Sequence, residues 1–549
     1  MVRKVILLFN TVRHLKARQV FYRIYYHFKK IHLLQQEVGG ELALLNEFKW
    51  NGPSYVAQSL FNDETACFLN ECCSIKNSVV WNDKSKSKLW LYNLHYFDDL
   101  NSLNSDERFE YHYRYIHRWV DENPPVLGNG WEPYTLSLRL VNLVKWCSRN
   151  DIQDNKILSS LAQQGNALRQ QFEYHVLANH LFVNAKALVF VGSFLGGKLG
   201  KDCLNKGMYV LEQEMKEQFL KDGAHFELSP MYHSLIMWDV LELIDLAIKT
   251  NKKELIFEID KWKEIAAKGI KWLSLMCHPD NDISFFNDSA FSIAPKLERI
   301  KEYADKLGIR KISIDRDSII SMSDSGFSRV NLSDKGSVLL INHSEIKPSY
   351  QPGHAHADTL SFELSLLGQR VFVNTGTSQY GVSAERNRQR STLSHNTLNI
   401  DNRDSSEVWS GFRVARRAKV IEYAYEENKS KKIVTAAHDG YTYINSKFIH
   451  RRSWNYHNNL LVISDFLEGA STVKACSRYH IHPNVRIIEF SNNAASLQLP
   501  NGLTVNLKVI GGGISRHPYN YFPEFGLKLQ SEFIESRLID DELNFSISW

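Results

Sequence analysis

The pattern of apolar and polar positions divides the chain into two parts. From about residue 104 to 310, apolar residues recur with a period of about 3.6, which predicts amphipathic helices in series. Short breaks are indicated where Gly, Pro, Asn and Asp cluster, as in NPPVLGNGWEP, GSFLGGKLG and KDGAHFELSP. Helices joined by short breaks are typical of paired helices in a layered or toroidal array.

The period changes near residue 315. Beyond Ser325 the chain shows short alternating or β-branched runs, among them GSVLLINH, TLSFELSLL, NLLVISDFL and LTVNLKVIGG. Turn residues separate these runs, as in a large antiparallel sandwich. We therefore expect an N-terminal helical and extended segment (1–85), an all-α domain (86–315) and an all-β domain (316–549). A groove between the two domains is the expected place for a ligand.

The N-terminal segment mixes basic and apolar residues. Lys and Arg recur among apolar residues from Val2 to Lys30, and no acidic residue precedes Glu37. This pattern fits an amphipathic helix on an anionic membrane surface, or a helix docked on the protein with its cations in solvent. The apolar run VILLF is too short for a signal-peptide core, and no stretch is long enough to span a bilayer. We therefore expect a cytoplasmic protein, with peripheral membrane contact as one hypothesis.

Composition narrows the function classes. The apolar content of 43% and charged content of 23% describe a globular protein, and the net charge of +5 is compatible with an anionic substrate. That charge is far below the basic excess of nucleic-acid-binding domains, so nucleic acid is not an expected partner. The seven cysteines are odd in number and form no CxxC spacing. Free thiols in a reducing compartment are the expected state.

The segment YQPGHAHADTLSFE carries the most concentrated chemistry of the β half. His354 and His356 lie two residues apart and are followed by Asp358. In an extended chain the two imidazoles would face the same way. Such a pair is half of a metal site, or a base with a structural neighbour, or simply two hydrogen-bonded strand residues.

The helical half contributes two polar groups. In ANHLFVN, Asn179, His180 and Asn184 lie in an otherwise apolar helix, where they either find internal partners or line a wet site. In HFELSPMYHS, Ser229 is the expected N-cap and the following Pro the first helical residue. Tyr232 then falls in the first helical turn.

A third group follows the strand RVFVNTG. Tyr380 comes just after this strand, and Arg386, Arg388 and Arg390 precede His395. Arginines at alternate positions could clasp carboxylates or sulfates, or could belong to a solvated loop. A third histidine could also complete a metal site with the His-x-His pair.

These residues lie in motifs that, in this order, resemble the heparinase II/III-like polysaccharide lyases, and more closely the members encoded with surface-polysaccharide biosynthesis genes. The motifs are YNLHYFDDL, GWEPYTLSLRLVN, EYHVLANHLFVNAKAL, HFELSPMYH, HPDNDISFFNDSA, GHAHADTLSFEL and SEVWSGFRVARRA. The resemblance implies a multidomain α+β fold, in which an incomplete α/α toroid is followed by an antiparallel β-sandwich.

The resemblance also implies β-elimination at a uronic acid. A base removes the proton α to the carboxylate, the 4-O-glycosidic bond breaks, and an unsaturated uronate remains. Asn179 and His180 match the family residues that neutralise the carboxylate, while Tyr232 and His354 match its tyrosine and histidine that act as acid or base. Tyr380 is similar to a second tyrosine of some members.

Many members bind a structural zinc ion through a His, an Asp and a His. The matching residues here are His356, Asn374 and His395. A neutral amide is a poorer zinc ligand than a carboxylate, so zinc binding depends on whether Asn374 can replace the aspartate.

The leading hypothesis is a lyase that acts inside the cell on an acidic surface polysaccharide. Four residues are expected to contact this substrate: Arg386, Arg390, Glu227 and Asn184. A second hypothesis is a non-lytic glycan-binding or assembly protein on the same scaffold. A third is a toroidal glycoside hydrolase, which would need two facing carboxylates such as Glu227 and Asp358.

Overall fold

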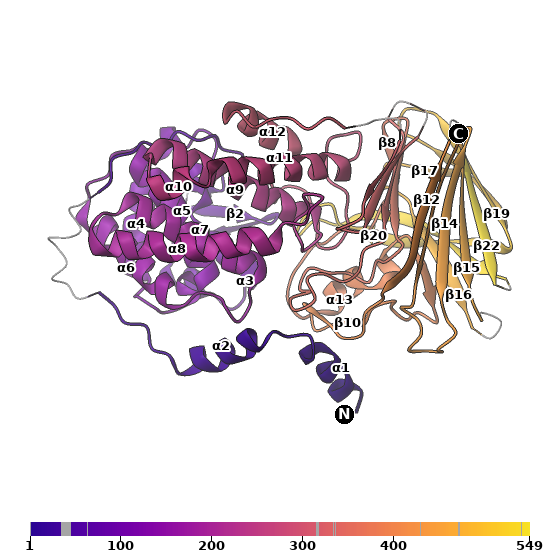
Figure 1. Cartoon of the computed structure of the whole chain (residues 1–549), viewed down its shortest axis with the longest axis horizontal. Helices are drawn as coiled ribbons and strands as arrows, with labels where there is room; N and C mark the ends of the chain where they lie inside the picture. The colour runs from indigo at the N-terminus through magenta and orange to yellow at the C-terminus, as the bar shows by residue number, and fades with distance from the viewer. Residues whose placement is uncertain are drawn as a thin grey trace.

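The structure is a computed structural model in which helices and strands occupy opposite ends of the molecule (Figure 1). It describes residues 2–34, 45–62, 64–314, 318–332, 334, 336–428, 430–469, 473–539 and 541–549. The last helix before the sandwich ends at Lys306 and the first strand after it begins at Ile319. The predicted boundary between residues 315 and 316 lies outside the described residues.

The helical layer follows the predicted amphipathic stretches. Its helices are α3 (Lys88–Tyr96), α4 (Phe109–Glu122), α5 (Pro133–Arg149), α6 (Asn155–Gln170), α7 (Ala178–Phe194), α8 (Gly197–Gln218), α9 (Pro230–Thr250), α10 (Lys253–Ile256), α11 (Ile259–Met276) and α12 (Leu297–Lys306). Helix α9 begins as predicted, because the Ser229 side chain accepts a hydrogen bond from the Tyr232 amide and Pro230 is the first helical residue.

The break predicted at GSFLGGKLG is shorter than expected, since α8 already begins at Gly197. A side chain on Gly192 of α7 would overlap the backbone of Leu204 in α8, and one on Gly200 would overlap the carbonyl of Leu195. These glycines allow the two helices to approach closely instead of ending the helical structure.

The N-terminal segment contains more regular structure than the sequence predicted. Helices α1 (Val2–Val12) and α2 (Ala17–Phe28) lie outside the helical layer, along one edge of the molecule (Figure 1). A small antiparallel sheet follows, formed by β1 (Leu60–Phe61), β2 (Thr65–Phe68) and β3 (Glu71–Ser74).

This small sheet corrects the expectation that all cysteines are free. Cys67 and Cys72 face each other across the β2–β3 hairpin and form a disulfide bond. The cross-strand register brings the two residues together, which no spacing rule indicated. The other five cysteines are free thiols.

The β domain is built from antiparallel sheets. The eight-stranded sheet has the order β12-β13-β14-β15-β22-β19-β18-β17, the five-stranded sheet the order β4-β5-β6-β7-β8, and the four-stranded sheet the order β20-β21-β16-β9. A short pair, β10 (Val408–Trp409) and β11 (Arg413–Val414), and helix α13 (Ala384–Arg390) lie outside these sheets. A shared apolar core includes Leu339 and Leu364 of the five-stranded sheet and Trp454 and Ile463 of the eight-stranded sheet.

The strands of the three larger sheets have the following bounds: β4 (Ile319–Met322), β5 (Phe327–Asn331), β6 (Val338–Asn342), β7 (Phe362–Leu366), β8 (Gln369–Phe372), β9 (Leu398–Ile400), β12 (Val420–Glu427), β13 (Lys431–His438), β14 (His450–His457), β15 (Leu460–Leu467), β16 (Ala475–His480), β17 (Arg486–Phe490), β18 (Ala494–Gln498), β19 (Thr504–Ile510), β20 (Gly512–Tyr521), β21 (Leu529–Leu538) and β22 (Glu542–Ser548).

The segment between α11 and α12 joins the two domains. Its residue His278 is fully buried, with one ring nitrogen 2.7 Å from the Glu363 carboxylate and the other 2.7 Å from the Ser365 hydroxyl, both on β7. Further along the same segment, the Asp288 amide donates to the carbonyl of His354 at 3.0 Å. The segment is therefore fixed beside the residues that precede β7.

Candidate active site

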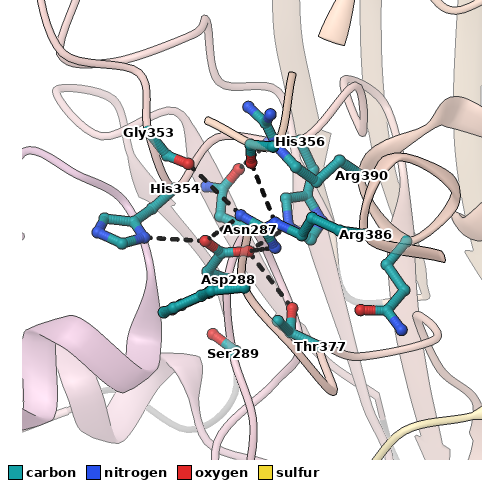
Figure 2. A network of polar contacts seen from close by, with 12 residues as sticks. Asn287, Asp288, Ser289, Gly353, His354, His356, Thr377, Arg386 and Arg390 are labelled. Atoms are coloured by element: carbon teal, nitrogen blue, oxygen red, sulfur yellow. Dashed lines mark hydrogen bonds and ion pairs between the residues drawn. The ribbon is translucent and has the colours of Figure 1, made fainter. Parts of the chain in front are cut away.

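Asp288 lies at the centre of a buried polar cluster where the two domains meet (Figure 2). Its Oδ2 is 2.8 Å from His354 Nδ1, and its Oδ1 is 2.7 Å from His356 Nε2. Arg386 donates to both carboxylate oxygens, and the Nη2–Oδ2 distance is 2.6 Å. One carboxylate thus contacts both histidines of the His-x-His pair. The two histidines precede strand β7, which begins at Phe362, so they are not part of that strand.

The cluster fixes the tautomer of His354. Burial alone would raise the pKa of Asp288, but the Arg386 charge and the histidine hydrogen bonds hold this pKa well below its usual range. The carboxylate is therefore ionised and accepts a hydrogen bond from the N–H group at His354 Nδ1. In the neutral imidazole, the lone pair then lies on Nε2, where it can accept a proton.

The His354 ring extends away from the Asp288 cluster, as Figure 2 shows, toward residues of the helical domain. Its centroid is 3.9 Å from that of Tyr232, and its Nε2 is 3.8 Å from Glu227 Oε2. The Tyr232 hydroxyl is 3.0 Å from the Tyr380 hydroxyl. Burial is the largest cause that raises the pKa of both phenols well above the ordinary value, so both hydroxyls are protonated near neutral pH.

Asn179 and His180 occupy the first turn of α7, as Tyr232 occupies the first turn of α9. The positive end of a helix dipole favours a nearby anion. His180 Nδ1 is 2.9 Å from Glu173 Oε1. Burial lowers the pKa of His180, but the Glu173 charge and hydrogen bond outweigh it and the net direction is upward. A cationic His180 suits a substrate carboxylate.

The orientation of Asn179 differs from the expected one. Its amide nitrogen donates to both oxygens of Glu227, at 2.9 Å each. Its Oδ1 is buried and has no hydrogen-bond partner among the described residues. The sequence predicted an amide donor for the substrate, whereas this arrangement leaves an acceptor available.

The four residues expected to contact substrate are instead internal. Glu227 is 1% exposed and holds the Asn179 amide. Asn184 is fully buried; its amide nitrogen donates to Ser137 and Glu173, and its oxygen accepts from the Glu173 amide. In this structure the polar atoms of these two side chains have internal partners, and their contact with a substrate stays a prediction.

Arg386 and Arg390 also have internal partners. Both lie on α13 and are fully buried. Arg386 binds Asp288, and Arg390 donates to the carbonyl of Ala355 at 2.9 and 3.0 Å. The two guanidinium groups hold the backbone on either side of His354 in place and do not present free charge to a sulfate.

The residues matched to a zinc site form a line of contacts. His356 Nδ1 is 3.3 Å from His395 Nε2, while His395 Nδ1 is 3.1 Å from Asn374 Oδ1. Asn374 therefore contacts the ring nitrogen of His395 that faces away from His356. The described residues contain no group of three or more His, Cys, Asp or Glu side chains that could hold a metal ion. In this arrangement the Asn374 oxygen lies away from the two histidine nitrogens that face each other, so zinc binding stays a prediction and we derive no step through a zinc ion.

The structure brings together five of the residues singled out in the sequence: Asn179, His180, Tyr232, His354 and Tyr380. Three further residues escaped notice. Asp288 orients His354, Glu173 binds His180, and the Tyr134 ring centroid lies 4.4 Å from that of His180. Asp288 lies in the motif HPDNDISFFNDSA. A histidine that acts as a base usually has a carboxylate partner, and this rule could have identified Asp288.

The class of protein is defined by an all-α domain joined to a β-sandwich, with His354, Tyr232 and Tyr380 in contact at the junction. The model for the heparinase II/III N-terminus matches residues 94–307, and the model for the heparinase II/III-like C-terminal region matches residues 315–549. The chain belongs to the heparinase II/III-like family.

Two curated relatives share part of the chain, and both are named heparin-sulfate lyase. The one from Pedobacter heparinus is 27% identical over 336 residues, which are 54% of this chain and 49% of the relative. The one from Bacteroides thetaiotaomicron is 22% identical over 345 residues, again 54% and 49%. The chain thus spans about half the length of the curated relatives it matches.

Solved structures confirm the predicted fold, an α/α toroid followed by an antiparallel β-sandwich. The crystal structure of heparinase III matches with a TM-score of 0.70 at 18% identity, over 85% of this chain and 79% of that one. A heparan sulfate lyase of Pedobacter heparinus matches with a TM-score of 0.58 at 17% identity, over 96% and 87%.

Proposed function

We propose that this protein is a polysaccharide lyase that cleaves a uronic-acid-containing polysaccharide by β-elimination. One observation carries the proposal: Asp288 fixes the tautomer of His354 so that Nε2 is the basic nitrogen, and this imidazole lies against a pair of protonated tyrosines. A base and an acid placed together are what proton abstraction at C5 and departure of O4 need.

In the proposed reaction His354 Nε2 takes the C5 proton. The electrons of the C5–H bond form the C4–C5 double bond while the C4–O4 bond breaks. Tyr232 gives its hydroxyl proton to O4, which leaves as a free hydroxyl group. Tyr380, with its hydroxyl 3.0 Å from that of Tyr232, supports the return of the proton after product release.

The carboxylate needs neutralisation because the C5 proton is otherwise only weakly acidic. A cationic His180 supplies charge, and its partner Glu173 keeps it protonated. The Oδ1 of Asn179, which has no partner among the described residues, accepts a hydrogen bond from a sugar hydroxyl, or from the substrate carboxyl group when that group takes a proton from His180. The proton or charge that His180 supplies favours the enediolate-like transition state over the ionised ground state.

The test is an ultraviolet assay for unsaturated uronate on a panel of uronic-acid polysaccharides. We expect activity from the wild type, with His354→Ala and Tyr232→Phe each lowering kcat by about 10²- to 10⁴-fold. Tyr209→Phe and His517→Ala, both at exposed positions, are the matched controls and keep full activity. Glycan binding without absorbance on any substrate would contradict the lyase and favour the non-lytic binding protein.

The hydrolase alternative predicts a different result on the same panel: new reducing ends in a reducing-sugar assay, without absorbance in the ultraviolet assay. It needs two carboxylates that face one bond. Glu227 binds Asn179, whereas Asp358 accepts from the Asn287 amide at 3.4 Å. The two carboxylates thus have separate internal partners, which supports the lyase over a hydrolase.

We propose further that the substrate is an acidic surface polysaccharide and that the enzyme acts inside the cell. The motif resemblance to members encoded with biosynthesis genes and the net charge of +5 support this. Because Arg386 and Arg390, the residues predicted to bind sulfate, are engaged internally, we expect no strict requirement for sulfate. The panel therefore includes sulfated and unsulfated glycans and the host's own surface polysaccharide, and a strict requirement for sulfate would contradict this part.

A further inference from the structure

Helices α1 and α2 turn their apolar side chains toward solvent. On α1, Val5, Phe9 and Val12 follow the i, i+4, i+7 spacing of one helical face, and Phe9 is 68% exposed. On α2, Phe21 and Ile24 are exposed on one face with Phe28, which is 77% exposed. Such stripes normally face a core, so their exposure on two successive helices needs an explanation.

The opposite faces of these helices are attached to the protein. Buried Gln19 of α2 donates to the carbonyls of Tyr350 at 3.2 Å and Val176 at 3.4 Å, and so contacts both domains. The Tyr22 ring packs on Tyr174, with 4.6 Å between centroids. These contacts fix the orientation of α2, and its apolar stripe points outward as a consequence.

The charge around the stripes has a single sign. Exposed cations flank both helices, and no acidic residue occurs before Glu37. Six cations of this segment are exposed and form no salt bridge with the described residues: Arg3, Lys4, Arg13, Arg18, Arg23 and Lys30. An apolar face bordered by lysine and arginine complements an anionic lipid surface, where acyl chains take the rings and headgroups the cations.

We propose that α1 and α2 form a docking surface for an anionic membrane. The stripes are convex helical faces, which can sink about 5–10 Å into the headgroup region of a bilayer. No described helix is long and apolar enough to cross a membrane, so the segment lies on the surface. Because Gln19 bonds to Val176 and Tyr350, close in sequence to Asn179 and His354, docking places the site near that surface. The docking does not depend on the proposed lyase activity.

The test is co-sedimentation of the full chain with phosphatidylglycerol–phosphatidylcholine vesicles and with pure phosphatidylcholine vesicles. We expect binding to the anionic vesicles only, weakened at high salt. Phe9→Ser/Phe21→Ser/Phe28→Ser and Arg3→Gln/Lys4→Gln/Arg13→Gln/Arg23→Gln are each expected to weaken binding by about tenfold or more. The matched controls, which keep binding, are Phe257→Ser/Leu503→Ser/Ile510→Ser and Lys253→Gln/Lys301→Gln/Lys306→Gln/Arg310→Gln.

Folding is checked by circular dichroism and thermal unfolding, and the single variant Phe28→Ser replaces the triple variant if the latter does not fold. Absence of wild-type binding to anionic vesicles would overturn the proposal, as would equal binding by the stripe variant. Light scattering measures whether the wild type and the triple variant form dimers. A dimer that the triple variant abolishes would show that a second copy of the chain covers the stripes, and this would also overturn membrane docking.

Discussion

Asp288 at the domain junction and Asp465 inside the sandwich are both fully buried against histidine and arginine side chains. Asp465 accepts from His450 Nε2 at 2.7 Å and from Arg452 at 2.7 and 2.8 Å. The other nitrogen of His450 is 3.1 Å from His438 Nε2, just as His356 meets a second histidine in the Asp288 cluster. The residue types of the two clusters therefore nearly coincide.

The two clusters differ in the histidine that contacts the aspartate, His450 in one and His354 in the other. Both nitrogens of His450 have internal partners, and its ring is fully buried. His354 uses only Nδ1 for its aspartate, while Nε2 faces Glu227 and the Tyr232 ring. An Asp–His–Arg cluster alone thus stabilises a fold, and it becomes a candidate for chemistry when one ring nitrogen is left for a ligand.

The largest expected difference between the clusters is catalytic. Asp288→Asn removes the acceptor that keeps the proton on His354 Nδ1, and we expect kcat to fall by about 10³- to 10⁴-fold. Asp465→Asn, measured on folded protein at a temperature below its unfolding transition, changes kcat by less than about threefold, because the cluster touches no reacting group. If the uronate assay showed equal losses of kcat in the two variants, the two clusters would not differ in their role in catalysis.

Stability is expected to respond alike in both clusters. Arg386→Met and Arg452→Met each leave a buried carboxylate without its cation, which costs about 3–5 kcal/mol. Denaturant unfolding followed by circular dichroism measures the loss, and Arg478→Met, at a partly exposed ion pair, is the control with a smaller effect. A loss of stability below about 1 kcal/mol for Arg386→Met would show that the Asp288 carboxylate finds another partner.

A smaller effect concerns pH. The pKa of His180 is raised because the Glu173 carboxylate outweighs burial, so activity that needs the imidazolium is present below this pKa and falls as pH rises through it. Glu173→Gln removes the largest cause that opposes burial, so the pKa of His180 falls and the alkaline limb of the kcat/KM profile should move to lower pH. Glu535→Gln, which removes the partner of Arg478, should not move it. An unchanged limb in Glu173→Gln would contradict the role of His180.

The smallest expected effect concerns metal. His356 with His395 and His438 with His450 are similar histidine pairs, with nitrogen distances of 3.3 and 3.1 Å. If both are hydrogen-bonded pairs, dialysis against a chelator should shift the midpoint of thermal unfolding by less than about 2 °C. Stoichiometric zinc by elemental analysis, with a large shift on its removal, would separate the two pairs and restore the metal site.

The sequence predicted the fold class because helical and strand periodicities are local properties of the chain. It also placed Tyr232 in the first turn of a helix, since Ser and Pro before a helix are local signals of its start. The partners of the site were harder to predict. Asp288 lies in a segment without periodicity, and only the tertiary fold brings it to His354. The directions of Arg386 and Arg390 were missed for the same reason, because α13 turns both side chains inward.

The unpaired oxygen of Asn179 has a consequence for inhibitor design. A buried acceptor without a donor carries a desolvation cost of about 1–3 kcal/mol, which a ligand recovers when it brings an N–H or O–H group to this atom. A uronamide carries such a group where the substrate has its carboxylate, whereas the uronate methyl ester carries none. Oligosaccharides that end in a uronamide should therefore inhibit more strongly than the matching esters, and Asn179→Leu should abolish that preference.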